Sequence, residues 1–185
     1  MSYASGTMTG TKWLSRSCRP ALTVAFVSSL LLFGCRDGAS AGDPPSASHV
    51  AGTKAAFRLQ TLEGRPLGPK DFPGQVVLVD FWATWCGPCH LQARILEDVY
   101  REYRGRGVQF LAADVGEERE VVRKFLQSAP IPYTVLLDPQ NVADSLGINA
   151  LPTLMVVDKK GRVSYFEPGI SDGDTIRKLL KEAGV

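Results

Sequence analysis

Apolar positions along residues 55–185 alternate between strand-like and helix-like spacing. Val76–Trp82 is apolar on both faces, which predicts a buried central strand. The next segment, Cys86–Arg104, is predicted as a helix because an apolar residue recurs at every fourth position, at Leu91, Ile95, Val99 and Tyr103. Val108–Val115 is predicted as the following strand. A strand, a helix and a strand in this order predict a parallel pair with a right-handed crossover.

The flanking segments carry weaker signals for shorter elements. Phe57, Leu59 and Leu67 flank the turn signal Glu63-Gly64, which predicts a short N-terminal hairpin. The other predicted elements are a helix over Glu117–Gln127 with Val121, Val122, Phe125 and Leu126 inward, a strand over Tyr133–Leu137, one or two helical turns over Asn141–Leu146, a hairpin of Thr153–Asp158 with Arg162–Phe166, and a closing helix over Asp174–Glu182. Residues 55–185 therefore form one predicted α/β domain.

The N-terminal 54 residues differ in composition from this domain. Residues 12–19 are basic and residues 20–34 almost wholly apolar, which is the pattern of a signal peptide. The apolar run of about 15 residues is short for a membrane-spanning helix, which needs about 20. Residues 1–34 are therefore predicted to be a signal peptide, and residues 35–54, rich in Gly, Ala, Ser and Pro, a flexible linker.

Cys35 ends the segment Leu32-Phe33-Gly34-Cys35, which resembles the lipobox of bacterial lipoproteins. The resemblance implies that Cys35 is lipidated and becomes the mature N-terminus, although Phe33 matches less well than a small residue would. Two alternatives stay open, a plain secretory signal cleaved at Ala39-Ser40-Ala41 and an uncleaved anchor. All three place the domain outside the cytoplasm, and Cys18 is expected to have no role.

The charge distribution argues against nucleic acid as a partner. Three of the 21 basic residues, Lys12, Arg16 and Arg19, precede residue 35, and all 19 acidic residues follow it. The remaining chain therefore carries a net charge of −1, which gives no basic surface for a polyanion.

Cys86 and Cys89 form a Cys-x-x-Cys motif at the start of the predicted helix. Unpaired N–H groups and the helix dipole stabilise a thiolate at that position, and a thiolate is the attacking species in disulfide exchange. Cys86 is therefore predicted as the nucleophile, and Cys89, one turn further in, as the resolving cysteine. A structural zinc site would need four ligands, but the domain has no second cysteine pair and no histidine after His90. No metal or other cofactor is expected.

The chain resembles the thioredoxin superfamily, and within it the TlpA-like periplasmic thiol–disulfide reductases, over about residues 55–183. The most specific motifs are the run from Asp80 to Cys89 and Gly147-Ile148 followed by Leu151-Pro152-Thr153. The resemblance implies a thioredoxin-like α/β fold, with a central mixed β-sheet flanked by helices and an N-terminal β-hairpin extension.

The resemblance also assigns roles around the cysteines. It implies that Gly87 and Pro88 set a reducing poise, as in thioredoxin, and that Asp80 accepts a proton from Cys89 through water. A carboxyl group inside an apolar strand should have a raised pKa, although a strand-end aspartate facing solvent is the alternative.

The expected substrate-binding residues are Trp85, Gly87, Pro88 and Leu151, and Pro152 is expected to belong to the catalytic set. Pro152 matches the superfamily's cis-proline, and Leu151 before it would offer backbone groups to a substrate strand. Trp85 is expected to cover the site and bind targets, whereas Trp82 is expected to belong half to the core. His90 is interpreted as a solvated helix residue.

The chain departs from TlpA-like proteins with dedicated roles in cytochrome maturation, which carry a glutamate and a proline where this chain has Gln92 and Arg94. Both are expected on the outer face of the helix. Their presence makes a dedicated role in cytochrome c maturation doubtful and favours a broader reductase role.

The leading hypothesis is an exported, lipid-anchored protein-disulfide reductase facing the periplasm. Its expected partners are periplasmic disulfide-bearing proteins, a membrane through the lipid anchor, and a membrane electron donor of the DsbD or CcdA kind. The alternatives are a peroxiredoxin-like peroxidase, although its Pro-x-x-x-Thr-x-x-Cys setting is absent, a copper-delivery protein, and a structural lipoprotein.

Overall fold

The computed structural model describes residues 50–185. The predicted signal peptide, Cys35 and residues 35–49 of the predicted linker lie outside the described residues. Residues 50–54, which also belong to the predicted linker, lie against β7 (Val163–Pro168), where the Gly52 N–H donates to the Val163 carbonyl at 2.8 Å. Within residues 50–185, no helix is both long enough and apolar enough to cross a membrane.

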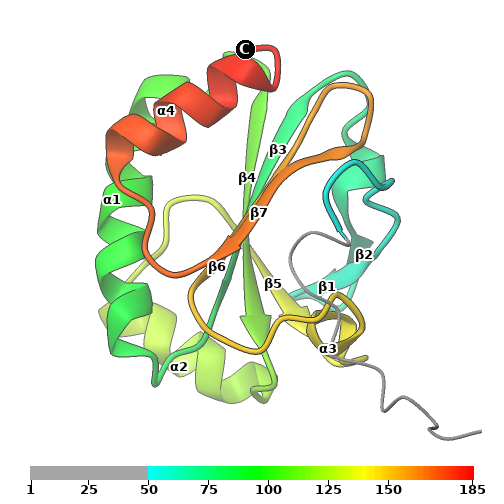
Figure 1. Ribbon diagram of the computed structural model, residues 1–185. Helices are drawn as coiled ribbons and strands as arrows, with labels where there is room; N and C mark the ends of the chain where they lie inside the picture. The colour runs from blue at the N-terminus through cyan, green and yellow to red at the C-terminus, as the bar shows by residue number, and fades with distance from the viewer. Residues whose placement is uncertain (1–49) are drawn as a thin grey trace, which may run out of the picture. The chain divides into compact units, whose positions relative to one another are not determined.

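A seven-stranded mixed sheet forms the centre of this domain, in the order β2-β1-β5-β4-β3-β6-β7 (Figure 1). Its strands are β1 (Leu59–Thr61), β2 (Pro66–Leu67), β3 (Val76–Trp82), β4 (Val108–Val115), β5 (Thr134–Asp138), β6 (Thr153–Val157) and β7. The three central strands β3, β4 and β5 run parallel, and the outer strands pair antiparallel. The predicted mixed α/β architecture, the parallel pair and the N-terminal hairpin are confirmed.

The helices divide between the two faces of the sheet. The helical segments are a short 3-10 turn over Pro69–Asp71, α1 (Gly87–Tyr103), α2 (Arg119–Ser128), α3 (Val142–Ser145) and α4 (Gly173–Glu182). Apolar residues of α1, α2 and α4 pack with Val76, Leu78 and Trp82 on one face. Residues of α3 and the N-terminal segment pack with the alternate β3 residues on the other. All seven residues of β3 are buried, because helices or loops cover it on both faces.

The predicted apolar rows of α1 and α2 are partly wrong. Leu91 is 44% exposed and Val121 is 46% exposed, whereas Gln92, expected on the outer face, is fully buried. The buried stripe of α1 is Cys89, Gln92, Leu96, Val99 and Tyr103, spaced alternately by three and four residues. A helix has 3.6 residues per turn, so residues spaced strictly by four move gradually around its surface. Leu91, the first residue of the predicted row, therefore lies outside the face of α1 that packs on the sheet.

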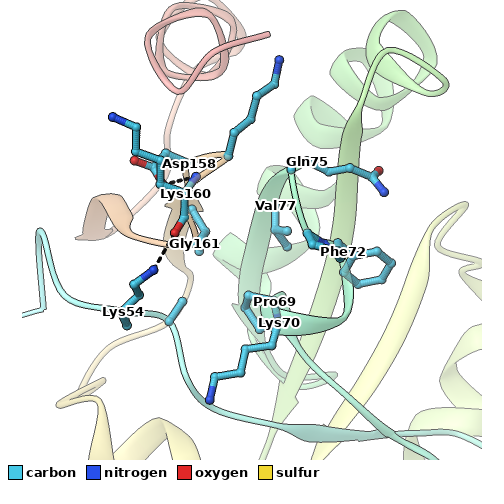
Figure 2. Close-up of a pocket in the computed structure, with 14 residues that line it drawn as sticks. Lys54, Pro69, Lys70, Phe72, Gln75, Val77, Asp158, Lys160 and Gly161 are labelled. Atoms are coloured by element: carbon cyan, nitrogen blue, oxygen red, sulfur yellow. Dashed lines mark hydrogen bonds between the residues drawn. The ribbon is translucent and has the colours of Figure 1, made fainter.

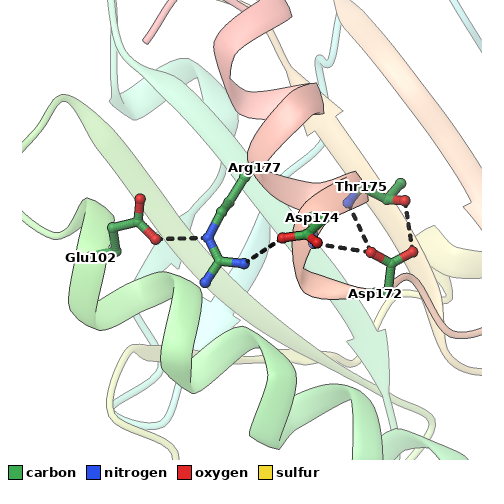
Figure 3. A network of polar contacts seen from close by, with 5 residues as sticks. All are labelled: Glu102, Asp172, Asp174, Thr175 and Arg177. Atoms are coloured by element: carbon green, nitrogen blue, oxygen red, sulfur yellow. Dashed lines mark hydrogen bonds and ion pairs between the residues drawn. The ribbon is translucent and has the colours of Figure 1, made fainter.

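Polar contacts tie α4 to α1 on the surface (Figure 3). Asp172 caps α4 by accepting the N–H groups of Asp174 and Thr175, both at 2.9 Å, and the Thr175 hydrogen bonds lower the pKa of its carboxyl. Arg177 then donates from Nε to Glu102 of α1 at 2.7 Å. The Arg177–Glu102 pair joins the two helices at the surface and adds little stability, because exposed ion pairs contribute little.

A cavity of about 260 Å³ opens at the start of β3, lined by Gln75 and Val77 and bordered by several lysines (Figure 2). Lys54 reaches across to donate to the Lys160 carbonyl at 2.9 Å. Since β3 runs from this cavity towards Trp82, the cavity lies at the opposite end of the strand from the cysteines.

Candidate active site

The cysteine pair lies where β3 passes into α1. Cys86 is the N-cap residue of α1, and its Sγ accepts a hydrogen bond from the Cys89 N–H at 3.3 Å. The two cysteines form a disulfide with their Cα atoms 5.3 Å apart. Cys86 is 4% exposed and Cys89 1% exposed, so both are covered in the oxidised protein and Cys89 lies deeper.

The position of Cys86 favours the thiolate once the disulfide is reduced. The Cys89 N–H already points at the Cys86 sulfur, and the helix adds the positive end of its dipole. Gly87 and Pro88 occupy the first turn, where the missing N–H of proline costs no helical hydrogen bond. The local geometry therefore suits a nucleophilic sulfur at residue 86.

The Leu151–Pro152 bond is cis. Thr153, the first residue of β6, pairs with Phe81 of β3, so Pro152 lies beside the end of β3 that leads to the cysteines. The Gly169 N–H donates to the Pro152 carbonyl at 2.7 Å. Trp85, next to Cys86, is 72% exposed, which makes it a large apolar side chain available to a partner.

Asp80 is buried in the middle of β3, at 1% exposure. Asp80 lies two residues from both Leu78 and Trp82, and residues two apart in a strand point to the same face. Its side chain therefore lies on the sheet face that packs against Cys89 and α1. Burial raises the pKa of Asp80 to about 7, and its Oδ1 atom has no hydrogen-bond partner among the described residues. The expected rise in pKa is confirmed, and the alternative of a solvent-facing aspartate is wrong.

Thr84, two residues before Cys86, is held at three atoms. The Glu117 carboxylate accepts both the Thr84 N–H and the Thr84 hydroxyl, the latter at 2.6 Å. His90 Nε2 lies 2.9 Å from the Thr84 carbonyl oxygen, and its ring stacks on Phe125 of α2 with centroids 5.3 Å apart. His90 is exposed, as expected, but it also contacts the turn that precedes the cysteines.

Behind Glu117 lies a second buried carboxyl group. Asp114 is fully buried at the end of β4 and accepts the Glu117 N–H at 3.3 Å. Burial, and next the hydrogen bond and negative charge of Glu117, raise the pKa of Asp114 to about 8. Asp114 is therefore mostly protonated near neutral pH.

The sequence alone did not identify Glu117 as part of this site, although a signal was present. Because β3 and β4 are parallel, their carboxyl ends meet, and the register pairs Trp82 with Asp114. Thr84 lies two residues after Trp82, and Glu117 lies three residues after Asp114. Polar residues just beyond the ends of neighbouring parallel strands are candidates for contact.

Among residues 50–185, no group of three or more His, Cys, Asp or Glu side chains is arranged to hold a metal ion.

Comparison with known proteins gives a consistent assignment. The Redoxin family model matches residues 48–181. Thiol-disulfide oxidoreductase ResA of Geobacillus thermodenitrificans is 33% identical over 133 residues, which cover 71% of this chain and 76% of the relative. The ResA of Geobacillus kaustophilus is 31% identical, and this match also covers 71% of this chain and 76% of the relative.

Solved structures show the same fold. A protein described as the thiol:disulfide interchange protein DsbE of Chlorobium tepidum superposes with a TM-score of 0.65 and 29% identity. The match covers 72% of this chain and 96% of that one. The expected thioredoxin-like fold is thus confirmed.

Proposed function

Because this chain belongs to the Redoxin family and is a thiol–disulfide oxidoreductase, we propose that it reduces disulfides of other proteins through Cys86 and Cys89. The observation that carries the proposal is a Cys-Gly-Pro-Cys pair at a helix N-terminus, beside the loop of a cis-proline. Disulfide-bearing proteins are the substrate class that this enzyme family implies.

The reaction proceeds in two balanced exchanges. In the first, the Cys86 thiolate attacks one sulfur of the substrate disulfide, a bond forms between Cys86 and that sulfur, and the other substrate sulfur leaves as a thiolate. In the second, Cys89 loses its proton and attacks Cys86. The Cys86–Cys89 disulfide forms, and the substrate leaves with both of its sulfurs reduced. Two electrons pass from the enzyme to the substrate in each cycle.

The residues around the sulfurs serve these steps. Trp85 offers exposed apolar surface to the substrate, and the Leu151 backbone offers a short edge for an extended substrate segment. Pro152 precedes Thr153, which pairs with Phe81 at the end of β3 that leads to the cysteines, so it would shape this edge. Gly87 and Pro88 would limit the hydrogen-bond donors around Cys86. Asp80, with a pKa near neutrality, is suited to accept the Cys89 proton in the second exchange.

We also propose that the protein acts outside the cytoplasm, tethered by a lipid on Cys35 with residues 35–49 as the tether. The basic and apolar leader and its lipobox-like end support this proposal. The periplasm of bacteria is kept oxidising, so a reductase there needs electrons from the membrane, and a donor of the DsbD or CcdA kind fits that need. Metabolic labelling with a radioactive fatty acid in cells expressing wild type and Cys35→Ser tests the anchor. Equal labelling would contradict it.

The proposed reductase activity is tested by turnover of a protein disulfide in the presence of excess dithiothreitol. Wild type should accelerate the reduction, and Cys86→Ser should abolish the acceleration. In a separate experiment, Cys89→Ser is reduced, freed of dithiothreitol and mixed with the substrate; it should stop after one exchange and accumulate a mixed disulfide that mass spectrometry detects. Unchanged turnover in Cys86→Ser would contradict the assignment, and peroxide consumption assayed in parallel separates a peroxidase from a reductase.

A further inference from the structure

A second cavity, of about 280 Å³, lies between α1 and α2 and reaches Cys89. Its walls include Trp82 from β3, Cys89 and Glu97 from α1, Phe125 from α2, and Ile131 and Tyr133 from the segment before β5. Cys89 has almost no exposed surface. The cavity therefore reaches the resolving cysteine from between α1 and α2, and Trp85 is not among the residues that line it.

Two buried polar atoms in the cavity wall lack a partner. Trp82 Nε1 and the Tyr133 hydroxyl make no hydrogen bond with any described residue, although Trp82 is only 2% and Tyr133 only 9% exposed. Buried polar groups in folded proteins are nearly always hydrogen-bonded, and ordered water is the usual partner when protein atoms are not. The cavity is large enough for several water molecules, so water is the occupant that its chemistry fits.

Tyr133 lies within electrostatic reach of two carboxyl groups. Burial raises the pKa of its hydroxyl well above the usual value, and the negative charges of Asp80 and then Glu97 raise it further. Asp80 is closed off from solvent, whereas the Glu97 side chain is 39% exposed and pairs with Arg101. Tyr133 and Glu97 line the cavity together with Cys89, so the cavity joins a buried sulfur to a partly exposed carboxyl group.

The remaining titratable groups around the cavity come from α1. They are Cys89 itself, His90 and Arg94. The residues contributed by α2 and by positions 129–132 are Phe125, Ala129, Pro130, Ile131 and Pro132, none of which titrates. Tyr133 is therefore the only lining side chain that both donates and accepts a hydrogen bond deep within the cavity, since Trp82 Nε1 only donates.

We propose that this cavity is the route by which the Cys89 proton reaches solvent, with Tyr133 as the positioning residue that orders water between Cys89 and Glu97, which both line the cavity. The inference rests on the proposed function, because it concerns the second exchange of the reductase cycle. In that step the Cys89–Cys86 bond forms, the bond from Cys86 to the substrate sulfur breaks, and the substrate sulfur leaves with the electron pair. Asp80 holds the Cys89 proton during the exchange, and the proton then leaves past Cys89, through the water that Tyr133 holds in the cavity, to the surface at Glu97.

The experiment isolates the second exchange. The reduced protein is mixed with the disulfide 5,5′-dithiobis(2-nitrobenzoate) in a stopped-flow instrument across a pH series. Attack by Cys86 releases one coloured 5-thio-2-nitrobenzoate and leaves the other bound to Cys86 as a mixed disulfide. Attack by Cys89 on Cys86 then releases the second coloured thiolate, in a phase whose rate does not depend on the reagent concentration. The variants are Tyr133→Phe, which removes only the hydroxyl, and Ala93→Leu, which fills the cavity from α1 without removing a polar group. Tyr165→Phe is the matched control, because Tyr165 packs against the same core and does not line the cavity.

Both variants should slow the second release at neutral pH by about tenfold, below the 100-fold or more of a directly placed acid or base. Tyr133→Phe should also shift the pH at which the rate reaches half of its maximum, an effect that a packing role would not produce. The control should match wild type. If both variants release the thiolate at the wild-type rate with the wild-type pH profile, the cavity does not carry the proton. If the wild-type protein itself releases none, the proposed function fails instead.

Discussion

Gln92 and Ser171, 79 residues apart in the chain, exchange two hydrogen bonds. The Ser171 N–H donates to Gln92 Oε1 at 2.7 Å, and Gln92 Nε2 donates to the Ser171 carbonyl at 3.2 Å. Gln92 lies one turn after Cys89, and Ser171 lies two residues after Gly169, which bonds the Pro152 carbonyl. This pair therefore ties the helix of the cysteines to the loop that supports the cis-proline.

Gln92→Glu should destabilise the protein above the pKa of the new carboxyl group. A carboxylate cannot donate to the Ser171 carbonyl and would lie buried beside it, which costs about 2–4 kcal/mol. Urea denaturation at acidic and at neutral pH measures this effect. The loss should be small in acid, where the protonated carboxyl group still donates, and Gln127→Glu on the exposed side of α2 should change stability little at either pH. An equal loss at both pH values would contradict the explanation.

Asp80→Asn should make the folded protein more stable at neutral to alkaline pH. The pKa of Asp80 is raised from 3.8 to about 7, so the folded state binds the proton more tightly than the unfolded state. Stability is therefore lost as pH rises from about 4 to about 7, and the full loss is about 4 kcal/mol.

Denaturation of wild type and Asp80→Asn across this pH range measures the difference. Asp114, with a pKa raised to about 8, contributes in the same direction in both proteins, so only the difference between them reports Asp80. The two curves should converge near pH 4, and parallel curves would show that Asp80 is not the titrating group. The same variant should slow the second exchange of the reductase cycle.

Glu117→Gln should loosen the turn that precedes the cysteines. The amide can accept only one of the two Thr84 hydrogen bonds with its oxygen, and the lost charge-assisted bond costs about 1–3 kcal/mol. We expect slower reduction of protein disulfides and a changed reduction potential of the Cys86–Cys89 pair. Glu118→Gln is the matched control, since Glu118 is exposed and makes no side-chain capping bond. Equal reduction potentials in wild type, Glu117→Gln and Glu118→Gln would show that the hydrogen bonds to Thr84 do not influence the cysteine pair.

Trp85→Ala should leave stability within about 0.5 kcal/mol of wild type, because Trp85 is 72% exposed. The variant should raise KM for a protein disulfide while leaving the rate with a small aromatic disulfide nearly unchanged. Steady-state assays with both substrates make the comparison. A similar loss with both substrates would place Trp85 in the chemistry of the sulfurs rather than in substrate binding.

Much of this architecture follows from local patterns. The continuous apolar run of β3 marks a strand buried on both faces. The next strand, β4, begins at Val108 and ends at Val115, which are the predicted bounds. Gly147, at the end of the short helical turn, has a φ of 74°, a conformation that glycine adopts without strain. Errors appear where the pattern leaves a choice of helix face, as at Leu91 and Val121, because a neighbouring element decides which face is covered.

The sequence by itself determined the strand–helix order, the cysteine pair at a helix start, and a carboxyl group within an apolar strand, because each depends on residues adjacent in the chain. Only the tertiary structure decided that Gln92 is buried against Ser171, that Glu117 holds Thr84, and that Tyr133 shares a cavity with Cys89. Each of these contacts joins segments at least 30 residues apart. Their geometry depends on how parallel strands align and on which helix covers which face, and the spacing of residues along the chain does not contain that information.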